Sequence, residues 1–485
     1  MALDEKLIEQ IVTQVVERLS SGEPRAESAK TGGAPAQSQA TDGVFEDMEA
    51  CIGAARQAHA QLLNVPVTVR RDIIESIREC GRANAEAYGR MEFEETELGK
   101  LEDNIQKNIS ACQVMGMEDL TPEVYAGDRG VTIVERIPVG VIASVNPVTN
   151  GAPTILFNSI MMLAGGNTVV MNPHPRTKKV SARLIRDLNK AIIAAGGPPN
   201  CVCCLADPTV PSAQFLMTHP HIGLLAVTGG HGVMDFASKT GKRLIAGGPG
   251  NPPVVVDETA DLARAAGNIV QGAGFSNCIA CASEKEIFVV DSVADDLKAA
   301  LRKQGACEIS PEQGEELLKH IFKEIKNPGE AGVINMDYIG KTPAFILKSI
   351  GLEIGSDIQI VILETGWDHP LVWTEQIMPV LPIVRCRDVD EAIDRAIAAE
   401  QNFGHSMAIH SNDLNNIRKM AARARCASFI KNGACGTGGV GVTGEGYVSF
   451  HIATNGDGHT RPRTFTQIRR CVMSDDLRYR FGEKG

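Results

Sequence analysis

Cys281 is the residue of this chain best placed for covalent chemistry. It lies in a loop of small residues, after a helical pattern over 261–271 and before an apolar run over 287–290. Loop side chains are exposed, and loop N–H groups can bind an anion. These features suit a thiolate that attacks a carbonyl carbon, provided that the thiol pKa is lowered and the resulting oxyanion is stabilised. Cys278, three residues earlier, is the rival nucleophile.

The composition is that of an ordinary globular protein and narrows the function classes. The chain has 485 residues, of which 43% are hydrophobic and 22% are charged. A net charge of −11 with 4% aromatic residues argues against a nucleic-acid surface. No apolar run reaches the roughly 18 residues of a membrane helix. Thirteen irregularly spaced cysteines indicate a reducing cytoplasm.

Three of those cysteines, Cys201, Cys203 and Cys204, lie close enough in sequence to suggest a metal site. However, no second CxxC or histidine pair lies nearby. The run 200–205 has the pattern of a short buried strand, in which free cysteine packs as a small hydrophobe. We therefore interpret the cluster as structural and predict no metal.

Two series of alternating strands and helices surround the thiol. The first runs from the strand at 141–145 to the strand at 222–227, and the second from 254–256 to 428–430. Such βαβ alternation predicts an α/β fold: two doubly wound domains of parallel sheet, with a ligand crevice at the carboxyl ends of the strands.

The two ends of the chain have separate patterns. Residues 1–19 predict an amphipathic helix, and 20–43 have the composition of a flexible linker. This helix must dock on its own domain, a sister subunit or another protein. Strand patterns at 131–136, 447–453 and 463–472 predict a flap that joins the sheet of a neighbouring subunit. The predicted organisation is therefore a domain over 44–252, with 126–140 in the flap, a thiol domain over 253–446, and oligomerisation strands and a tail over 447–485.

From about residue 44 to 475, the sequence resembles the aldehyde dehydrogenase superfamily. The matching runs are GNTVVMNP (166–173), VTGG (227–230), GGPGNP (247–252), EQIMP (375–379) and the Cys281 loop. Within the superfamily, the chain is similar to the CoA-acylating enzymes of bacterial microcompartments, of the ethanolamine- and propanediol-utilisation types. The runs that carry this closer similarity are NPPVVVDETADLA (251–263), SFIKNG (428–433), RTF (463–465) and RRC (469–471).

The resemblance assigns the catalytic roles. It implies that Cys281 is the nucleophile and that the Asn150 side chain helps the backbone N–H of Cys281 to stabilise the oxyanion. Asn150 could instead, or in addition, be a helix N-cap. Glu375 matches the carboxylate that binds the nicotinamide ribose, although it could be a surface glutamate.

The resemblance also implies the cofactors NAD and CoA, which would share one groove. Thr228, Gly229 and Gly230 follow a strand and open a helix, so their N–H groups can approach a pyrophosphate. Gly248 is a further cofactor-binding candidate. The adenosine side is assigned to Asn172, Pro173 and His174, for which simple turn roles remain open.

One absence separates acylating from hydrolytic chemistry. Hydrolytic members carry a glutamate base before the Gly-Gly run, and Ala246 aligns with that position here. General-base help is typically worth roughly 10²–10⁴-fold, so water should attack a thioester poorly without it. A thiol needs less help because it is partly ionised near neutral pH. His405 could assist CoA, or could simply be a packed histidine.

The predicted function is therefore conversion of a short-chain aldehyde (acetaldehyde or propionaldehyde), NAD⁺ and CoA to acyl-CoA and NADH through a Cys281 thioester. The alternatives are a hydrolytic aldehyde dehydrogenase and a non-catalytic shell-cargo protein. The predicted partners are the aldehyde, microcompartment shell proteins that bind residues 1–19, and further copies in a homodimer or dimer of dimers. The predicted location is inside a microcompartment in the cytoplasm.

Overall fold

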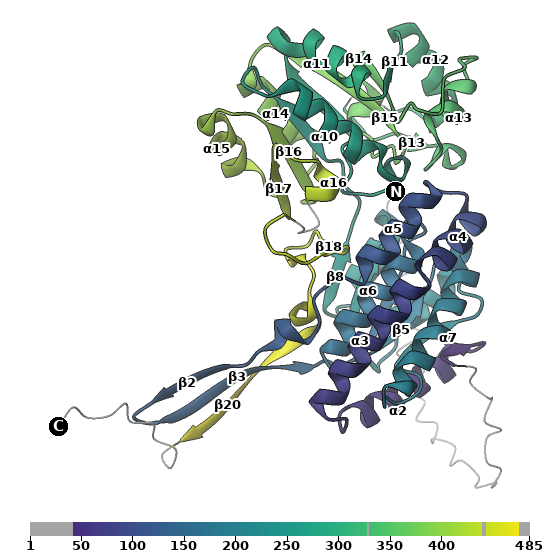
Figure 1. Ribbon diagram of the computed structural model, residues 1–485, viewed down its shortest axis with the longest axis vertical. Helices are drawn as coiled ribbons and strands as arrows, with labels where there is room; N and C mark the ends of the chain where they lie inside the picture. The colour runs from purple at the N-terminus through teal and green to yellow at the C-terminus, as the bar shows by residue number, and fades with distance from the viewer. Residues whose placement is uncertain (1–41, 327–328, 439–442, 475–485) are drawn as a thin grey trace, which may run out of the picture. The chain divides into compact units, whose positions relative to one another are not determined.

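The computed structural model describes residues 42–326, 329–438 and 443–474. By its internal contacts the chain divides into residues 1–40 and 41–485. The predicted helix at 1–19 and nearly all of the linker at 20–43 lie outside the described residues. Residues 41–485 contain a six-stranded sheet, a seven-stranded sheet and a three-stranded sheet, together with two short hairpins (Figure 1).

The six-stranded sheet is parallel throughout, as the strand–helix alternation predicts. Its order is β1-β6-β5-β4-β7-β8. The strands are β1 (Val44–Phe45), β4 (Val141–Val145), β5 (Thr168–Asn172), β6 (Val202–Leu205), β7 (Ile222–Thr228) and β8 (Leu244–Gly247). Its helices are α2 (Met48–Leu62), α3 (Val67–Ala83), α4 (Ala85–Thr96), α5 (Leu101–Ala111), α6 (Gly151–Ala164), α7 (Lys178–Ala194), α8 (Val210–Thr218) and α9 (His231–Lys239).

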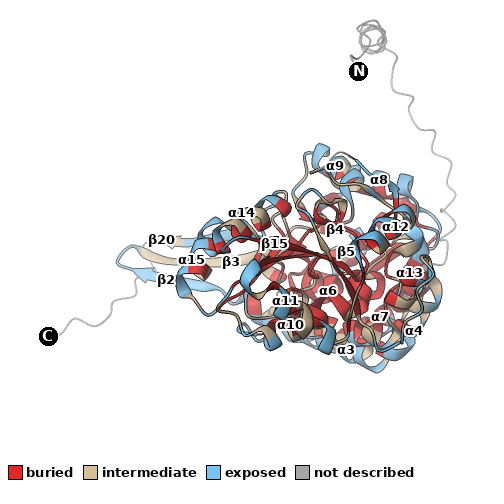
Figure 2. Cartoon of the chain, turned by 90° about the horizontal axis from the view of Figure 1, so that it is seen from above, coloured by how far each residue is buried: buried red, intermediate tan, exposed pale blue. Residues whose placement is uncertain are grey.

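Alternate residues of these strands pack on opposite faces of the sheet. On β5, Val169 and Met171 join the core formed with α3, α6 and α7, whereas Val170 joins the core formed with α2, α8 and α9. The period of two in a strand produces this division. Helix α6 is buried along its whole length (Figure 2), which explains why its sequence is almost continuously apolar. The three clustered cysteines fall on β6 or just before it and are fully buried, as the strand pattern predicts.

The seven-stranded sheet is also parallel, in the order β11-β14-β15-β10-β9-β16-β17. Its strands are β9 (Pro253–Val256), β10 (Glu286–Val290), β11 (Ala306–Glu308), β14 (Ile360–Thr365), β15 (Val380–Cys386), β16 (Ser406–His410) and β17 (Ser428–Lys431). Its helices are α10 (Leu262–Gly274), α11 (Asp291–Lys303), α12 (Pro311–Ile321), α13 (Pro343–Lys348), α14 (Val389–Ala399), α15 (Leu414–Arg423) and α16 (Cys435–Gly438). The α/β prediction is confirmed for both sheets.

The third sheet forms an antiparallel arm (Figure 1) of β2 (Glu123–Gly127), β3 (Gly130–Pro138) and β20 (Thr466–Ser474). Thr466 pairs with Pro138 and Ser474 with Gly130, so β20 covers all of β3. The predicted pairing of 463–472 with the strand near residue 131 is therefore confirmed, but that of 447–453 is wrong. Within that run, β18 (Ile452–Ala453) pairs instead with β19 (Gly458–His459), because the tight turn between them brings them together. The arm begins at Glu123, not at residue 126.

Shorter elements complete the described chain. The second hairpin joins β12 (Phe322–Glu324) and β13 (Val333–Ile334). Single-turn 3₁₀ helices lie at η1 (Met117–Leu120), η2 (Pro175–Thr177), η4 (Met336–Tyr338), η5 (Pro370–Val372) and η6 (Pro462–Phe465). The short turn η3 (Phe275–Cys278) has non-helical backbone angles at Ser276 and Asn277. Among residues 42–326, 329–438 and 443–474, no helix is both long and apolar enough to cross a membrane.

Candidate active site

A cavity of about 610 Å³ opens at the carboxyl ends of β4, β5 and β7. Strand β4 lies between β5 and β7, and the chain leaves it first toward β5 and later toward β7. Such a reversal of strand order leaves a crevice between the connections on the two sides. The loop that carries Cys281 and the segment that carries Glu375 complete the cavity from the seven-stranded sheet.

Cys281, and not Cys278, faces this cavity. Cys281 lines the cavity and is partly exposed. Cys278 is fully buried, accepts a hydrogen bond from Lys285 Nζ at 3.2 Å, and donates one to the carbonyl of Glu284 at 3.4 Å. A thiol enclosed in this way cannot meet a substrate without rearrangement of the loop. The geometry therefore favours Cys281 as the nucleophile.

The backbone before Cys281 has an unusual conformation. Ser276, Asn277 and Cys278 all have positive φ, at 51°, 53° and 60°, although none is glycine. Such residues cost of order 1–3 kcal/mol each and persist only when their surroundings fix them. Asn277 Nδ2 donates to the carbonyls of Gly99 and Gly340, at 2.9 Å each.

Helix α5 provides further contacts to the same loop. Asp103 accepts a hydrogen bond from the Ser276 N–H at 2.6 Å, and the buried Lys107 donates to Ser276 Oγ at 3.2 Å. The loop is thus fixed by side chains of the elements around it.

Gly250 lets the chain between β8 and β9 pass close to the thiol loop. A Cβ atom at this position would lie 2.7 Å from the carbonyl oxygen of Cys281 and 2.9 Å from His405 Cγ. Contacts this short do not occur for real Cβ atoms, so any larger residue would displace the loop. The Gly250 N–H also donates to Glu375 Oε1 at 3.2 Å.

The surroundings of Cys281 affect its ionisation in opposing ways. Burial, followed by the charge of Glu375, raises the pKa of the Cys281 thiol to about 12. The charge of Lys285 and the backbone N–H groups of Cys281 and Ala282 lower this pKa, but burial outweighs them. The surrounding groups of the chain therefore do not by themselves supply the lowered thiol pKa that nucleophilic attack requires.

Alkylation of Cys281 should consequently depend steeply on pH. Because each unit below the thiol pKa changes the thiolate fraction tenfold, we expect its iodoacetamide rate to rise about tenfold per unit from roughly pH 7 to pH 10. Mass spectrometry of the Cys281 peptide measures this rate, with N-acetylcysteine in the same tube as the unperturbed reference. A plateau below about pH 8 would contradict the raised pKa.

Asn150 occupies the N-cap position of α6, but its side chain does not cap the helix. Glu92 takes that role: its Oε1 accepts hydrogen bonds from the N–H of Gly151 at 2.6 Å and of Ala152 at 3.4 Å. The preceding residue, Thr149, lines the cavity, and its carbonyl accepts a hydrogen bond from Lys107 at 3.3 Å. The Asn150 amide is therefore not used for capping.

Glu375 is the only acid among the described residues that line the cavity. Burial raises the pKa of its carboxyl to about 6, while the charge of Lys285 opposes that rise. Glu375 is half-buried, lines the cavity and accepts the Gly250 N–H, so it is not an ordinary surface glutamate.

The proposed cofactor residues also line the cavity. Thr228 ends β7, and Gly230 is the N-cap of α9. Gly248 lines the cavity as well and has its N–H near Thr454 Oγ1. A Cβ on Gly230 would meet no atom within 4 Å, so the helix start is open for approach. Thr228, Gly229 and Gly230 all belong to the lining.

The adenosine-side candidates line the cavity but also have local structural roles. The Asn172 side chain accepts a hydrogen bond from Ser212 Oγ at 2.6 Å, which joins β5 to α8. His174 Nδ1 accepts one from the N–H of Arg176 at 3.1 Å and thereby caps η2. Pro173 lies between them in the lining. Both polar side chains therefore have local hydrogen-bond partners.

Arg176 is a lining residue that the sequence analysis missed. It is the only lysine or arginine among the described residues of the cavity wall, and its guanidinium donates to the carbonyl of Thr96. The sequence did offer one signal for Arg176, because it lies two residues after His174. The segment that follows a parallel strand enters the crevice.

Four residues discussed for their chemistry lie outside the lining: Asn150, Cys278, Ala246 and His405. Ala246 lies on β8, directly before Gly247 and Gly248, and is nearly buried. His405 is buried, with Nδ1 bonded to Ser406 Oγ at 3.0 Å, so it is a packed histidine. Burial and then the Lys285 charge lower the pKa of His405 to about 3.

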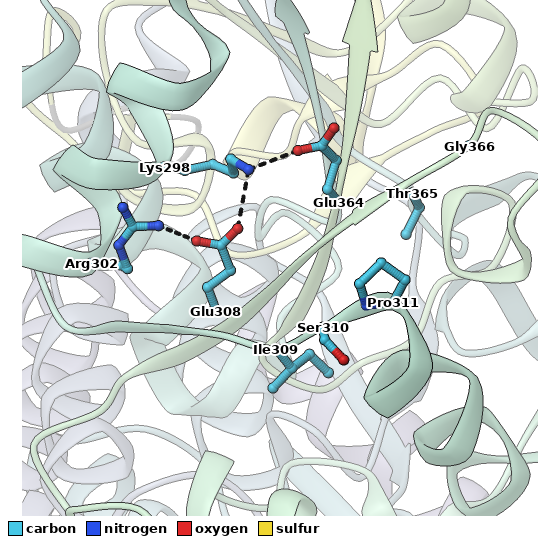
Figure 3. A pocket seen from close by; sticks show the side chains of 9 residues that line it. All are labelled: Lys298, Arg302, Glu308, Ile309, Ser310, Pro311, Glu364, Thr365 and Gly366. Carbon is cyan, nitrogen blue, oxygen red and sulfur yellow. Dashed lines mark hydrogen bonds and ion pairs between the residues drawn. The ribbon is translucent and has the colours of Figure 1, made fainter.

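A second cavity, of about 1010 Å³, lies on the seven-stranded sheet, and the described residues that line it include no cysteine or histidine (Figure 3). Lys298 bonds to Glu308 at 3.1 Å and to Glu364 at 2.7 Å, and Arg302 pairs with Glu308. These ion pairs join α11 to β11 and β14. Its charges are mutually paired, so we assign no chemistry to this larger cavity.

Comparison with known proteins agrees with this geometry. The aldehyde dehydrogenase family model matches residues 15–309 and 355–449. An acetylating acetaldehyde dehydrogenase of Salmonella typhimurium is 42% identical over 98% of this chain and all of its own length. The crystal structure of Rhodopseudomonas palustris propionaldehyde dehydrogenase, with bound CoA and an acylated cysteine, is 39% identical. It has a TM-score of 0.86 and covers 89% of this chain and 98% of that one.

A third relative is the propionaldehyde dehydrogenase of the Clostridium phytofermentans fucose utilisation bacterial microcompartment. It is 40% identical, with a TM-score of 0.87, and the match covers 90% of this chain and all of the other. The resemblance found in the sequence is confirmed. The chain belongs to the aldehyde dehydrogenase family, among relatives that include acylating enzymes.

Proposed function

We propose that this chain is a CoA-acylating aldehyde dehydrogenase that converts a short-chain aldehyde, NAD⁺ and CoA to acyl-CoA and NADH. One observation carries the proposal: Cys281 faces a cavity whose described lining contains a single acid, Glu375. The carboxylate of Glu375 already accepts a hydrogen bond from the Gly250 N–H. The relatives named above, which include an acetylating enzyme and a structure with CoA and an acylated cysteine, support it.

Cys281 begins the reaction as a thiolate, after its proton has left to solvent. Its sulfur adds to the aldehyde carbon, and the new oxyanion accepts hydrogen bonds from the Cys281 N–H and the Asn150 amide. NAD⁺, when bound along Thr228, Gly229 and Gly230, supplies the hydride acceptor. Loss of hydride from the carbon restores the C=O bond and leaves an acyl thioester on Cys281.

The second half of the reaction releases the acyl group to a thiol. A CoA thiolate attacks the thioester carbon, and collapse of the adduct expels the Cys281 thiolate, so the enzyme returns to its starting state. Water competes poorly because Ala246 replaces the glutamate base and lies outside the lining. Both cofactors would use the same adenosine end of the cavity, near Pro173.

CoA dependence tests this function against hydrolysis. With an aldehyde and NAD⁺ but no CoA, we expect one burst of NADH per site and then turnover slowed by roughly 10²–10⁴-fold. Chromatography should find acyl-CoA as the product when CoA is present. Free carboxylic acid formed equally fast without CoA would establish the hydrolytic alternative. Absence of both the burst and turnover would favour the non-catalytic alternative.

Arg176 provides a separate prediction for CoA binding. CoA carries several phosphate groups, and a hydrogen bond to a charged partner is worth about 1.5–3 kcal/mol. We therefore expect Arg176→Met to raise the KM for CoA by about tenfold to a hundredfold, while the NADH burst measured at saturating NAD⁺ changes little. Arg176→Lys, which keeps the charge, is the matched control. An unchanged KM in the methionine variant would remove Arg176 from the CoA site.

The partners and location follow from the same proposal. Residues 1–19 would bind shell proteins, which would place the enzyme inside a bacterial microcompartment in the cytoplasm. The fucose-microcompartment relative supports this. Deleting 1–19 should abolish co-purification with shells while activity in solution persists. Loss of both, or of neither, would contradict the tether.

The arm supports assembly into a homodimer or dimer of dimers. Its residues Val124, Ile468 and Val472 are each at least 60% exposed, and a small sheet with such a surface gains stability by pairing.

We also propose the division into 44–252 and 253–446, since the strands of the two large sheets fall within 44–247 and 253–431.

A panel of kcat/KM values for acetaldehyde and propionaldehyde would identify the substrate, since one methylene changes pocket binding by about 1–3 kcal/mol.

A further inference from the structure

Lys285 is a lysine enclosed directly behind the thiol loop. It is among the largest side chains that are completely buried. Its Nζ donates to the carbonyl of Cys278 at 2.9 Å and to the carbonyl of Ala280 at 3.1 Å, and it contacts Cys278 Sγ at 3.2 Å. Within the described parts of the chain, it takes part in no ion pair of 4 Å or less. A lysine is rarely enclosed without a paired carboxylate, so its position requires a reason.

The contact with Ala280 has a direct consequence for Cys281. The Ala280 carbonyl and the Cys281 N–H belong to one peptide unit, and the described chain has no cis peptide. In a planar trans peptide the C=O and N–H point in opposite directions. Because the carbonyl accepts from Lys285 Nζ, the N–H of Cys281 points away from Lys285.

A charged donor on the carbonyl also strengthens the N–H at the other end of the amide. Hydrogen bonds in series polarise one another, and this effect is larger where water is absent. The N–H of Cys281 is the backbone donor proposed above for the oxyanion. Lys285 therefore acts on that donor through a single peptide unit.

The charge of Lys285 also reaches the other ionisable groups of the site. It favours the ionised form of Cys281, Cys278 and Glu375, and it opposes protonation of His405. The remaining titratable groups that interact with this ammonium are Glu284, Glu286 and Cys435. The ammonium is thus a buried positive charge surrounded mainly by groups that ionise to anions.

We propose that Lys285 is a positioning residue for the reaction: it orients and polarises the Ala280–Cys281 peptide unit, and its charge stabilises both the thiolate and the oxyanion that forms from it. This inference rests on the proposed role of Cys281 as the nucleophile. The proposed role of Lys285 has two parts: orientation of the Cys281 N–H donor and supply of a positive charge. Two variants can distinguish them.

Lys285→Met tests both effects together, because methionine fills a similar volume without donors or charge. Two rates are measured: the NADH burst with propionaldehyde and NAD⁺, and the alkylation of Cys281 by iodoacetamide across a pH series. Alkylation forms no oxyanion, so it reports the thiolate alone. We expect the burst to slow roughly 10²-fold. The plot of log alkylation rate against pH should shift about one unit to higher pH, because a lost charge changes a thiol pKa by this order.

Lys285→Gln separates the two effects, since glutamine keeps N–H donors but has no charge. It is expected to recover part of the burst rate and none of the alkylation rate. Cys278→Ala is the matched control, because it removes a different contact of the same Nζ and should leave both rates near those of the wild type. If the methionine variant does not fold, as judged by its thermal unfolding, the glutamine variant decides alone: wild-type alkylation in a folded Lys285→Gln protein would overturn the charge role.

The outcome for Lys285 is distinguishable from that for the proposed function. Wild-type protein treated with propionaldehyde and NAD⁺ without CoA should carry the mass of an acyl group on the Cys281 peptide. If this adduct is absent in the wild type, the proposed function itself is wrong. If it forms in the wild type and forms equally fast in a folded Lys285→Met protein, with unchanged alkylation, only the role of Lys285 is overturned.

Discussion

Replacing Cys281 by alanine is expected to lower the rate of acyl-CoA formation by at least about 10⁴-fold, because removal of a covalent nucleophile eliminates the intermediate on which both half-reactions depend. Neither the cavity nor its cofactor contacts should change. Cys281 lines the cavity as one small, partly exposed residue, and the loop before it is fixed by other side chains. NAD⁺ binding should therefore persist in the variant while the NADH burst is lost.

The measurement is a stopped-flow NADH assay, with NAD⁺ affinity measured by fluorescence titration. Cys278→Ala is the matched control. Its sulfur is buried and bonded to Lys285, so most of the activity should remain, at some cost in stability. The opposite pattern, in which Cys278→Ala is inactive and Cys281→Ala is active, would reverse the assignment of the nucleophile.

Replacing Asn150 by alanine is expected to lower kcat by about 10²–10³-fold, the usual cost of losing one oxyanion donor. The physical reason is that the amide meets charge only after the sulfur has added to the aldehyde. Its loss therefore destabilises the transition state more than the bound substrate. The rate of NADH formation in a single turnover measures this effect directly.

The structure provides two internal controls for Asn150. Alkylation of Cys281 by iodoacetamide forms no oxyanion, so its rate should not change in Asn150→Ala. The unfolding temperature should also change little, because Glu92, rather than Asn150, caps α6. A large fall in unfolding temperature with normal single-turnover kinetics would show instead that Asn150 is a structural residue.

The sequence was sufficient for features that depend on local pattern. Alternating strands and helices predicted two parallel sheets, because periods of two and 3.6 residues are visible in a single chain. A cysteine in a loop between a helix and a strand indicated the nucleophile region. The resemblance to the aldehyde dehydrogenases, rather than a local pattern, placed Ala246 where hydrolytic members carry the base. The strands β11, β12 and β13 have only two or three residues each, which is too short for a period of two to be recognised in the sequence.

What the chain alone determined is thus the two-sheet framework, the strand ends at which a crevice must form, and the thiol segment beside it. Only the tertiary structure decided that Cys281 faces the cavity while Cys278 does not, that Glu92 caps the helix of Asn150, and that Lys285 lies behind the reactive peptide. Glu92 lies about 60 residues from the helix it caps, and Lys107 lies 169 residues from the Ser276 hydroxyl that it contacts. Partners so far apart in sequence meet only when the chain is folded, and one sequence by itself carries no periodic signal of their contact.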